Sequence, residues 1–364
     1  MPPSAPLLVF VTMFAADQAG GIQAFHLDPA KGTLAPAAVT RDCPNGFFLT
    51  LSPDRRTLYS LTAKKFGEAD TEEVIAWRIA DRAGMLEPLG RRPTKGPVSC
   101  YTDTDPSGRA LLVAHYNGAT VAALPLSADG SLAGDPVAVR HEGKGADPGR
   151  QEAPHPHAII PAPAAEGSPQ FAYAADLGAD AIFAYRLDAA AGRLVANDPP
   201  LVKTKPGAGP RHLAFHPDGR RLYAINELDN TVATYDFHSA TGRLVERQVI
   251  STLPPDFKGK AYTADLKITP DGRFLYGTNR GHDSIAAYEI GPDGFLTLIE
   301  IVPSRGRGPQ NLAITPDGSL LLCANMPGDN LAVFRVDRET GKLAAIGEPA
   351  TVKTPSCIAV VPGE

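Results

Sequence analysis

Short runs that alternate apolar and polar residues recur along the whole chain. Three successive examples are "RRLYAIN", "TVATYDF" and "LVERQVI", at residues 220–226, 231–237 and 244–250. A period of two with aromatic and β-branched side chains is typical of half-buried β-strands. With "HLAF" at 212–215, these runs form one unit of four strands. No segment shows a long 3.6-residue period, so the pattern predicts an all-β protein.

Two turn phrases punctuate these runs and give the number of units. The first is a polar turn followed by Gly-x-Leu, as in "SATGRL", where glycine supplies the positive φ of a tight hairpin. It occurs seven times, 46 to 62 residues apart, with its glycine at Gly32, Gly84, Gly130, Gly192, Gly242, Gly294 and Gly341. The second phrase resembles "PDGRRLY" and also has seven copies, beginning at Pro53, Pro106, Pro163, Pro217, Pro270, Pro316 and Pro362. Two separate counts of seven predict a seven-bladed β-propeller with four-stranded blades.

The two ends of the chain carry incomplete units. The chain begins at a second strand, "LLVFVTM", and ends on a lone first strand, "CIAVV". We expect the C-terminal strand to join the N-terminal blade and close the ring, because this pairing removes an exposed sheet edge. Residues 1–364 are then one propeller domain, since neither end can be removed without opening the ring.

The first strand of each blade lines the central channel of a propeller. Counting six residues back from each proline of the second phrase gives seven equivalent positions, which are Phe47, Cys100, His157, Arg211, Ala264, Gln310 and Ser356. Four of them directly follow a proline, which fixes the entry of a strand where no ladder donor is needed. Because His157 and Arg211 occupy equivalent places on adjacent blades, we expect them to converge at the mouth of the channel.

Charged residues also follow the ends of two second strands. Glu227 comes after Asn226, and Arg280 comes after Asn279. The asparagines are interpreted as turn caps. Glu227 and Arg280 lie one place further and break this pattern with charge, so we expect both to reach the same bowl as His157 and Arg211.

The loop "RHEGKGADPGRQEAPHPH" lies in the widest gap between repeats, 62 residues. Arg150 and Gln151 are expected to reach over the bowl and contact the substrate, with His155 in support. His155 and His157 flank Pro156, and we expect their side chains to point to opposite faces. We therefore predict that they diverge and form no metal site.

Composition narrows the functional class. The net charge of −5 gives no broad basic surface for nucleic acid, and no apolar run is long enough to span a membrane. The N-terminal stretch is interpreted as the opening strand of the chain rather than as an export signal. Four distant cysteines without a CxxC motif suit buried thiols in a reducing cytoplasm and give no zinc signature. We expect a cytoplasmic monomer or weak homo-oligomer with no metal or organic cofactor.

Several phrases resemble a known family. "RQEAPHPHA", "GPRHLAFHPDGRRLYAINEL", "GRFLYGTNRGHDSIAAY" and "GPQNLAITPDG" are similar to the lactonases with a seven-bladed β-propeller fold. That family includes bacterial 6-phosphogluconolactonases and fungal carboxymuconate lactonizing enzymes. The resemblance covers nearly the whole chain and implies a catalytic set of His157, Arg211, Glu227 and Arg280. It departs at Asp265, where many relatives have glutamate.

The resemblance implies hydrolysis of a sugar lactone, with 6-phosphogluconolactone of the pentose phosphate pathway as the first candidate. Water would attack the ring carbonyl, and either His157 or Glu227 would remove its proton. Arg211 would stabilise the oxyanion and Arg280 would hold an anionic group of the substrate. Further substrate contacts are expected from His155, Arg150, Gln151, Gln310 and Asp265.

Two alternative functions are also compatible with these sequence features. A muconate-type lactonizing enzyme would employ the same acid, base and arginines, with proton transfer to carbon in place of attack by water. A non-enzymatic propeller could act as a binding scaffold. The scaffold is disfavoured because four chemically active residues fall in one sector of the predicted ring.

Overall fold

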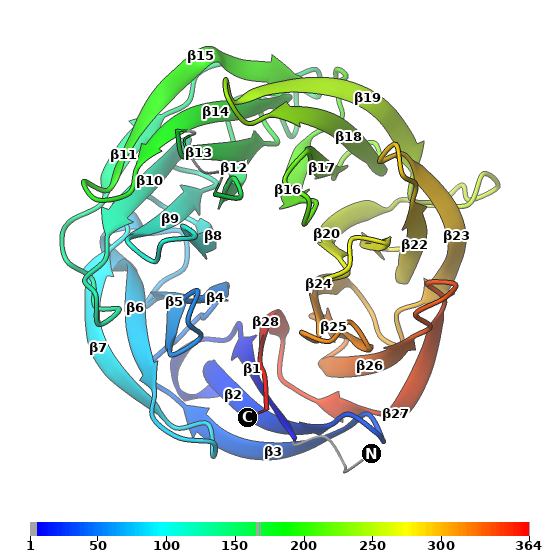
Figure 1. Ribbon diagram of the computed structural model, residues 1–364. Coiled ribbons are helices and arrows are strands. Elements are labelled where there is room, and N and C mark those ends of the chain that lie inside the picture. The colour runs from blue at the N-terminus through cyan, green and yellow to red at the C-terminus, as the bar shows by residue number, and fades with distance from the viewer. Residues whose placement is uncertain (1–5, 165–166, 168, 364) are drawn as a thin grey trace. The chain divides into compact units, whose positions relative to one another are not determined.

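Antiparallel sheets of four strands make up nearly all of the computed structural model, which describes residues 6–164, 167 and 169–363. There are seven such sheets in this part of the chain (Figure 1). The helices within it are two short 3-10 turns, η1 (Asp17–Ala19) and η2 (Ala69–Thr71). No described helix has the length and apolar character needed to cross a membrane. Residues 165, 166 and 168, which belong to the copy of the proline phrase that begins at Pro163, lie outside the described residues, as do 1–5 and 364.

The chain groups into two compact units, and each is described by itself. The first contains the residues up to Gly46, residues 79–86 and the residues from Ser251 onward. It holds three sheets. In order of pairing, their strands are β28 (Pro355–Val361), β1 (Leu7–Met13), β2 (Gly21–Asp28) and β3 (Thr33–Thr40); β20 (Tyr262–Ile268), β21 (Phe274–Arg280), β22 (Ser284–Ile290) and β23 (Leu296–Pro303); and β24 (Pro309–Ile314), β25 (Leu320–Asn325), β26 (Asn330–Val336) and β27 (Leu343–Thr351).

The second unit contains residues 47–78 and 87–250 and holds the other four sheets. Their strands are β4 (Leu49–Leu51), β5 (Thr57–Ala63), β6 (Glu72–Ile79) and β7 (Leu86–Pro93); β8 (Ser99–Thr104), β9 (Ala110–His115), β10 (Thr120–Pro125) and β11 (Val137–Arg140); β12 (Pro156–Pro161), β13 (Phe171–Asp176), β14 (Ala181–Asp188) and β15 (Arg193–Lys203); and β16 (Pro210–Phe215), β17 (Arg221–Asn226), β18 (Thr231–His238) and β19 (Arg243–Ser251).

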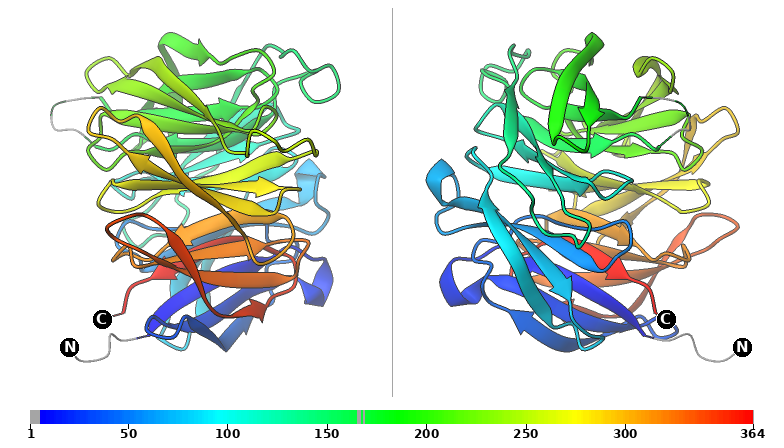
Figure 2. Two further views of the ribbon diagram at one scale, coloured as in Figure 1. Left: turned by 90° about the vertical axis from the view of Figure 1, so that its right-hand side faces the viewer. Right: turned by 60° about the vertical axis from the view of Figure 1, so that its left-hand side comes forward.

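The two ends of the chain share one sheet, as the incomplete terminal units predict. Strand β28 pairs antiparallel with β1, with Val360 opposite Val9 and Ile358 opposite Val11. Figure 2 shows the red C-terminal strand beside the blue N-terminal strands. These apolar residues are buried in a cluster that continues into β25 and β26. The hydrophobic surface buried on both faces of β1 therefore holds the last strand of the chain in place.

The two repeated phrases of the sequence are joined by a hydrogen bond between neighbouring sheets. The hydroxyl of Tyr173, from the proline phrase of one sheet, donates to the carbonyl of Gly242, from the Gly-x-Leu turn of the next, at 2.6 Å. Tyr59 and Gly130 make the same bond, as do Tyr276 and Gly341. Gly242 has a φ of +69°, and a Cβ there would lie 2.5 Å from the Phe171 ring. In these three pairs of sheets, the proline phrase of one sheet therefore contacts the Gly-x-Leu turn of the next.

Candidate active site

The predicted channel-entry positions coincide with irregularities in strand pairing. Regular pairing is interrupted at Cys100 in β8, His157 in β12, Arg211 in β16 and Gln310 in β24. Such a β-bulge leaves one residue out of the ladder and re-aims its side chain. A proline precedes three of these residues. It is tolerated there because an interrupted strand ladder does not need the N–H that proline lacks. Counting back from the turn phrase thus locates a repeated backbone feature that presents side chains.

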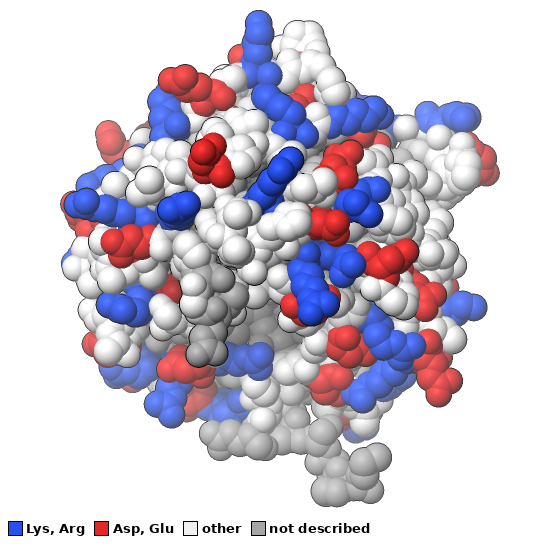
Figure 3. Space-filling view, turned by 45° about the horizontal axis from the view of Figure 1, so that its top comes forward, with Lys and Arg blue, Asp and Glu red and all other residues white. Residues whose placement is uncertain are grey.

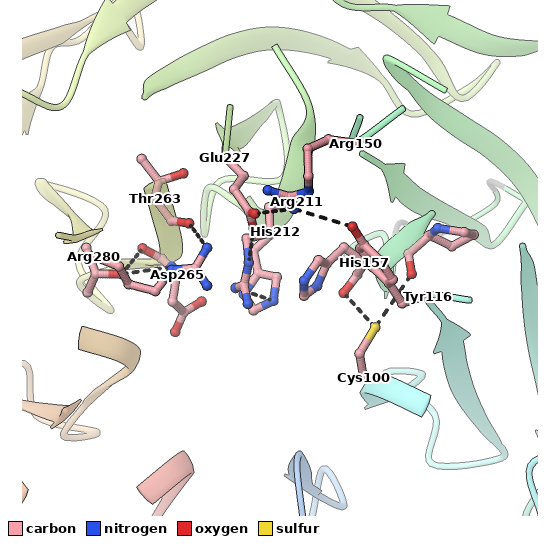
Figure 4. Close-up of polar contacts among 12 residues, drawn as sticks. Cys100, Tyr116, Arg150, His157, Arg211, His212, Glu227, Thr263, Asp265 and Arg280 are labelled. Atoms are coloured by element: carbon pink, nitrogen blue, oxygen red, sulfur yellow. Dashed lines mark hydrogen bonds and ion pairs between the residues drawn. The ribbon is translucent and has the colours of Figure 1, made fainter. Parts of the chain in front are cut away.

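The centre of the candidate site is a carboxylate held between two guanidinium groups, all in the second unit (Figure 4). Arg150 Nη2 donates to Glu227 Oε1 at 2.7 Å, and Arg211 Nε donates to Glu227 Oε2 at 2.9 Å. The side chains of Arg211 and Glu227 are only 2% and 5% exposed, whereas that of Arg150 is 34% exposed. Glu227 is fixed just beyond β17, where its N–H donates to the carbonyl of Gly209 at 2.7 Å. One negative and two positive groups leave a net positive charge, which reaches solvent at Arg150.

Arg150 also contacts a tyrosine that the candidate set did not include. Its Nη2 lies 3.4 Å from the hydroxyl of Tyr116. Partial burial disfavours the charged form of Arg150, but its hydrogen bonds with Tyr116 and Glu227 outweigh burial and raise the pKa of the guanidinium. Burial also raises the pKa of the Tyr116 hydroxyl, partly offset by Arg150. Arg150 is therefore charged, and Tyr116 is a neutral phenol, across the working pH range of the protein.

His212 is a further buried group at this site, and its role was missed from the sequence although it directly follows Arg211. Arg211 Nη1 lies 3.1 Å from His212 Nε2. The His212 ring lies edge-on to Tyr101 and His157, with centroid distances of 5.0 and 5.5 Å. The missed signal is the bulge at Arg211, which interrupts the alternation that would otherwise turn the next residue away.

The two histidines of "HPH" do not point apart as expected. The ring of His155 stacks on Tyr116 at 4.4 Å, and the ring of His157 meets Tyr116 edge-on at 5.3 Å. The predicted divergence is wrong because residues two apart on an extended strand share a face rather than face opposite ways. His155 is buried, with Nδ1 3.0 Å from the Tyr116 carbonyl and Nε2 3.1 Å from Glu152. These contacts give His155 a supporting position behind His157.

Gln151 lies in the predicted loop but does not reach out from it. It is 1% exposed, and its Nε2 donates to the Leu177 carbonyl at 2.7 Å and to Asp180 Oδ1 at 2.6 Å. The same carboxylate accepts the N–H of Gly209 at 2.9 Å. The amide of Gln151 is thus used inside the protein, and its expected contact with substrate stays a prediction. Through Asp180 it ties the loop that carries Arg150 to the segment that leads into Arg211.

Cys100 lies beneath His157 with a protonated thiol. Its Sγ is 3.5 Å from the carbonyl oxygens of both Pro156 and His157. Burial raises the pKa of this thiol to about 12, against the opposing charge of Arg211. All four cysteines are buried and form no disulfide bond, as expected. The thiol therefore donates to the backbone at the bulge and is not a nucleophile.

The remaining candidates belong to the first unit. Arg280 ends β21, and its Nη2 donates to the Thr263 carbonyl at 2.8 Å. Gln310 is buried at the bulge of β24. Asp265 is fully buried, and Lys267 Nζ, Asn311 Nδ2 and the Leu312 N–H donate to it at 2.8 to 2.9 Å. These donors use its carboxylate to join β20 to β24, and the expected contact of Asp265 with substrate stays a prediction.

Charge on the surface is mixed. On the face drawn in Figure 3, Lys and Arg are interspersed with Asp and Glu, in keeping with the net charge of −5. Among the described residues, no group of three or more His, Cys, Asp or Glu side chains is arranged to hold a metal ion. The candidate site in the second unit offers the imidazole of His157, the guanidinium groups of Arg150 and Arg211, and the carboxylate of Glu227.

Comparison with known proteins places this site in a family. The family described as "Lactonase, 7-bladed beta-propeller" matches residues 8–360. A 6-phosphogluconolactonase of Bacillus subtilis (strain 168) is 32% identical over 352 residues, which cover 96% of this chain and 97% of that protein. A 6-phosphogluconolactonase of Pectobacterium carotovorum is 31% identical over 86% of this chain and 87% of its own length.

Solved structures agree with this placement. The periplasmic gluconolactonase of Pseudomonas aeruginosa superposes with a TM-score of 0.89 at 31% identity, covering 98% of this chain and 99% of that one. A protein of Bacteroides fragilis, described as a putative 6-phosphogluconolactonase, also gives a TM-score of 0.89, at 28% identity and 99% coverage of both chains. The predictions of a seven-bladed propeller and of a lactonase, a carboxylic ester hydrolase, are confirmed. The chain belongs to the lactonase family with the seven-bladed β-propeller fold, and its seven four-stranded sheets are the blades.

Proposed function

We propose that this protein hydrolyses a sugar lactone and that its substrate is 6-phosphogluconolactone. The observation that carries the proposal is the buried Arg211–Glu227 pair with the partly exposed Arg150, close to His157 through His212 and Tyr116. Lactone hydrolysis develops negative charge on a carbonyl oxygen, and guanidinium groups fixed in a water-poor site stabilise such charge. The Bacillus subtilis relative, named a 6-phosphogluconolactonase, supports the choice of substrate.

In the proposed mechanism, His157 removes a proton from the water that attacks the ring carbonyl. Both oxygens of Glu227 accept hydrogen bonds from guanidinium groups, so we assign Glu227 to positioning Arg150 and Arg211 rather than to proton transfer. Arg211 stabilises the oxyanion.

We assign Arg150 to binding the phosphate of the substrate. Its guanidinium stays charged, is 34% exposed and is already aligned by Glu227 and Tyr116. An arginine held in this way binds phosphate through two parallel hydrogen bonds with little further ordering. The Pseudomonas aeruginosa relative is named a gluconolactonase, so the phosphate is the feature of the substrate that most needs a test.

The test is a pH-stat assay of δ-gluconolactone and its 6-phosphate, with spontaneous hydrolysis subtracted. His157→Gln should lower kcat by about 10²- to 10⁴-fold, the usual contribution of a general base. His238→Gln, at an exposed position of β18, is the control and should leave kcat unchanged. No acceleration of either lactone by the wild-type protein would refute the proposal. Turnover of an enoate instead would point to the lactonizing alternative.

The role of Arg150 is tested in the same assay. Arg150→Met should raise KM for the phosphorylated lactone by about 10-fold or more, since a charge-assisted hydrogen bond is lost. KM for the unphosphorylated lactone should change much less. The matched control is Arg193→Met, at an exposed position of β15. Equal effects of Arg150→Met on both lactones would show that Arg150 does not bind the phosphate.

The setting of this activity forms part of the proposal. We place the protein in the cytoplasm and the pentose phosphate pathway, as a monomer or weak homo-oligomer without a cofactor. Cell fractionation and sedimentation of the purified protein test the location and the oligomeric state.

A further inference from the structure

We propose that His212 is a positioning residue that holds Arg211 in its working orientation and does so only while its own ring is neutral. The inference rests on the proposed function, because it assigns Arg211 to the oxyanion. The observation behind it is the 3.1 Å contact between Arg211 Nη1 and His212 Nε2. Both side chains are buried.

The direction of this hydrogen bond follows from the chemistry of arginine. A guanidinium group has N–H donors and no acceptor, so the nitrogen of His212 that faces it must be the acceptor. His212 Nε2 therefore carries no proton, and the neutral ring carries its proton on Nδ1. Arg211 is thus held at two edges, by Glu227 at Nε and by His212 at Nη1. Two contacts at different edges of the guanidinium restrain its rotation more than either contact does by itself.

Protonation of His212 would reverse this contact. A proton on Nε2 would face the guanidinium donor, and two positive groups would then lie 3.1 Å apart in a buried site. The aromatic rings that meet His212 from other strands carry no negative charge. They are the rings of His157 on β12, Tyr101 on β8 and Phe48 before β4, with the protonated thiol of Cys100 near Arg211. Glu227, the nearest carboxylate named here, is already shared by Arg150 and Arg211. Arg211 must therefore lose its orientation when His212 takes up a proton.

Two substitutions of His212 distinguish the effect of its hydrogen-bond acceptor from the effect of its aromatic ring. His212→Gln places an amide oxygen that can accept from Arg211 and does not titrate, whereas His212→Phe keeps a planar ring without an acceptor. At pH 8 we expect His212→Gln to retain kcat within about 3-fold and His212→Phe to lose about 10- to 100-fold. KM for the unphosphorylated lactone should change little in either variant, because Arg211 acts on the oxyanion of the transition state.

The pH profile gives a sharper test. If His157 and His212 must both be neutral, log kcat/KM of the wild type should rise with a slope approaching two on the acidic side. His212→Gln should reduce that slope to about one, because only His157 then titrates. An unchanged acidic slope in His212→Gln, or full activity in His212→Phe, would overturn the inference.

A measurement on the resting protein does not depend on turnover. Long-range ¹H–¹⁵N correlation of histidine-labelled protein reports which ring nitrogen carries the proton, and His212→Gln identifies the signal. We expect the Nδ1–H form at pH 8. An Nε2–H form or an imidazolium would overturn the inference even in an active enzyme. Conversely, an inactive wild type with the Nδ1–H form would refute the proposed function and leave the contact with Arg211 established.

Discussion

The buried pair of Arg211 and Glu227 should cost the protein stability when either partner is changed alone. Glu227→Gln keeps the size of the side chain but removes the negative charge. Arg211, 2% exposed, would then be a buried cation without its carboxylate, whereas Arg150 is exposed enough to regain water. Removing one partner of a buried pair typically costs about 3–5 kcal/mol. We therefore expect the free energy of unfolding to fall by about 3 kcal/mol in Glu227→Gln.

Replacing both partners should be far less damaging. In Arg211→Met/Glu227→Leu, two apolar side chains fill the same space and no charge is left buried. The loss should then be roughly 1 kcal/mol, from the His212 nitrogen that no longer receives a donor. The single variant Arg211→Met completes a double-mutant cycle, measured by urea denaturation. Both Arg211 variants should be inactive as lactonases.

The control for this cycle is an exposed ion pair. Arg78 and Glu87 are 57% and 60% exposed and lie 3.4 Å apart, so Glu87→Gln should leave the urea midpoint unchanged. If the double variant lost as much stability as the two singles together, Arg211 and Glu227 would not be energetically coupled. That result would refute our reasoning that each single change is costly because it leaves the other partner as an uncompensated buried charge.

Two further predictions concern stability. Burial lowers the pKa of His115 from its ordinary 6.5 to about 4, so the unfolded chain binds a proton at higher pH than the folded one. Stability should fall by about 3 kcal/mol as the pH drops from 6.5 to 4. A variant His115→Gln should lose less over that range in urea titrations, and an unchanged pH dependence would contradict this assignment. Truncation before Pro355 removes β28 and exposes the edge of β1, so we expect aggregation and loss of the cooperative thermal transition. A monomeric truncated protein with an unaltered melting temperature would show that β28 is dispensable.

Much of the local structure was predictable because it follows from the alternation of apolar and polar residues and from repeated turn phrases. The expected strands at 212–215, 220–226, 231–237 and 244–250 correspond to β16–β19 within one or two residues at nearly every end. The pairing of the terminal strands was also predictable, since an incomplete unit at each end leaves only one way to remove an open edge. Even the bulge positions could be found by counting from a turn, because each repeat uses the same backbone path.

Several side-chain contacts lie outside what short periods encode. Gln151 and Asp265 were expected to contact substrate, and each is also used by donors or acceptors inside the protein, with Asn311 46 residues from Asp265. The divergence of His155 and His157 was wrong because residues two apart on a strand share a face. His212 was missed because its partner lies beside it in the sequence, where alternation predicts no contact.

The sequence by itself determined the number of blades, the course of the strands, the pairing of the termini and the positions at which inner strands present side chains. These features follow from periodic burial and turn chemistry, which depend on neighbouring residues. Only the tertiary structure decided that Arg150 and Arg211 share Glu227, 77 and 16 residues away, and that His212 completes the contact. A hydrogen bond depends on distance and direction between particular atoms, and packing between blades sets those quantities.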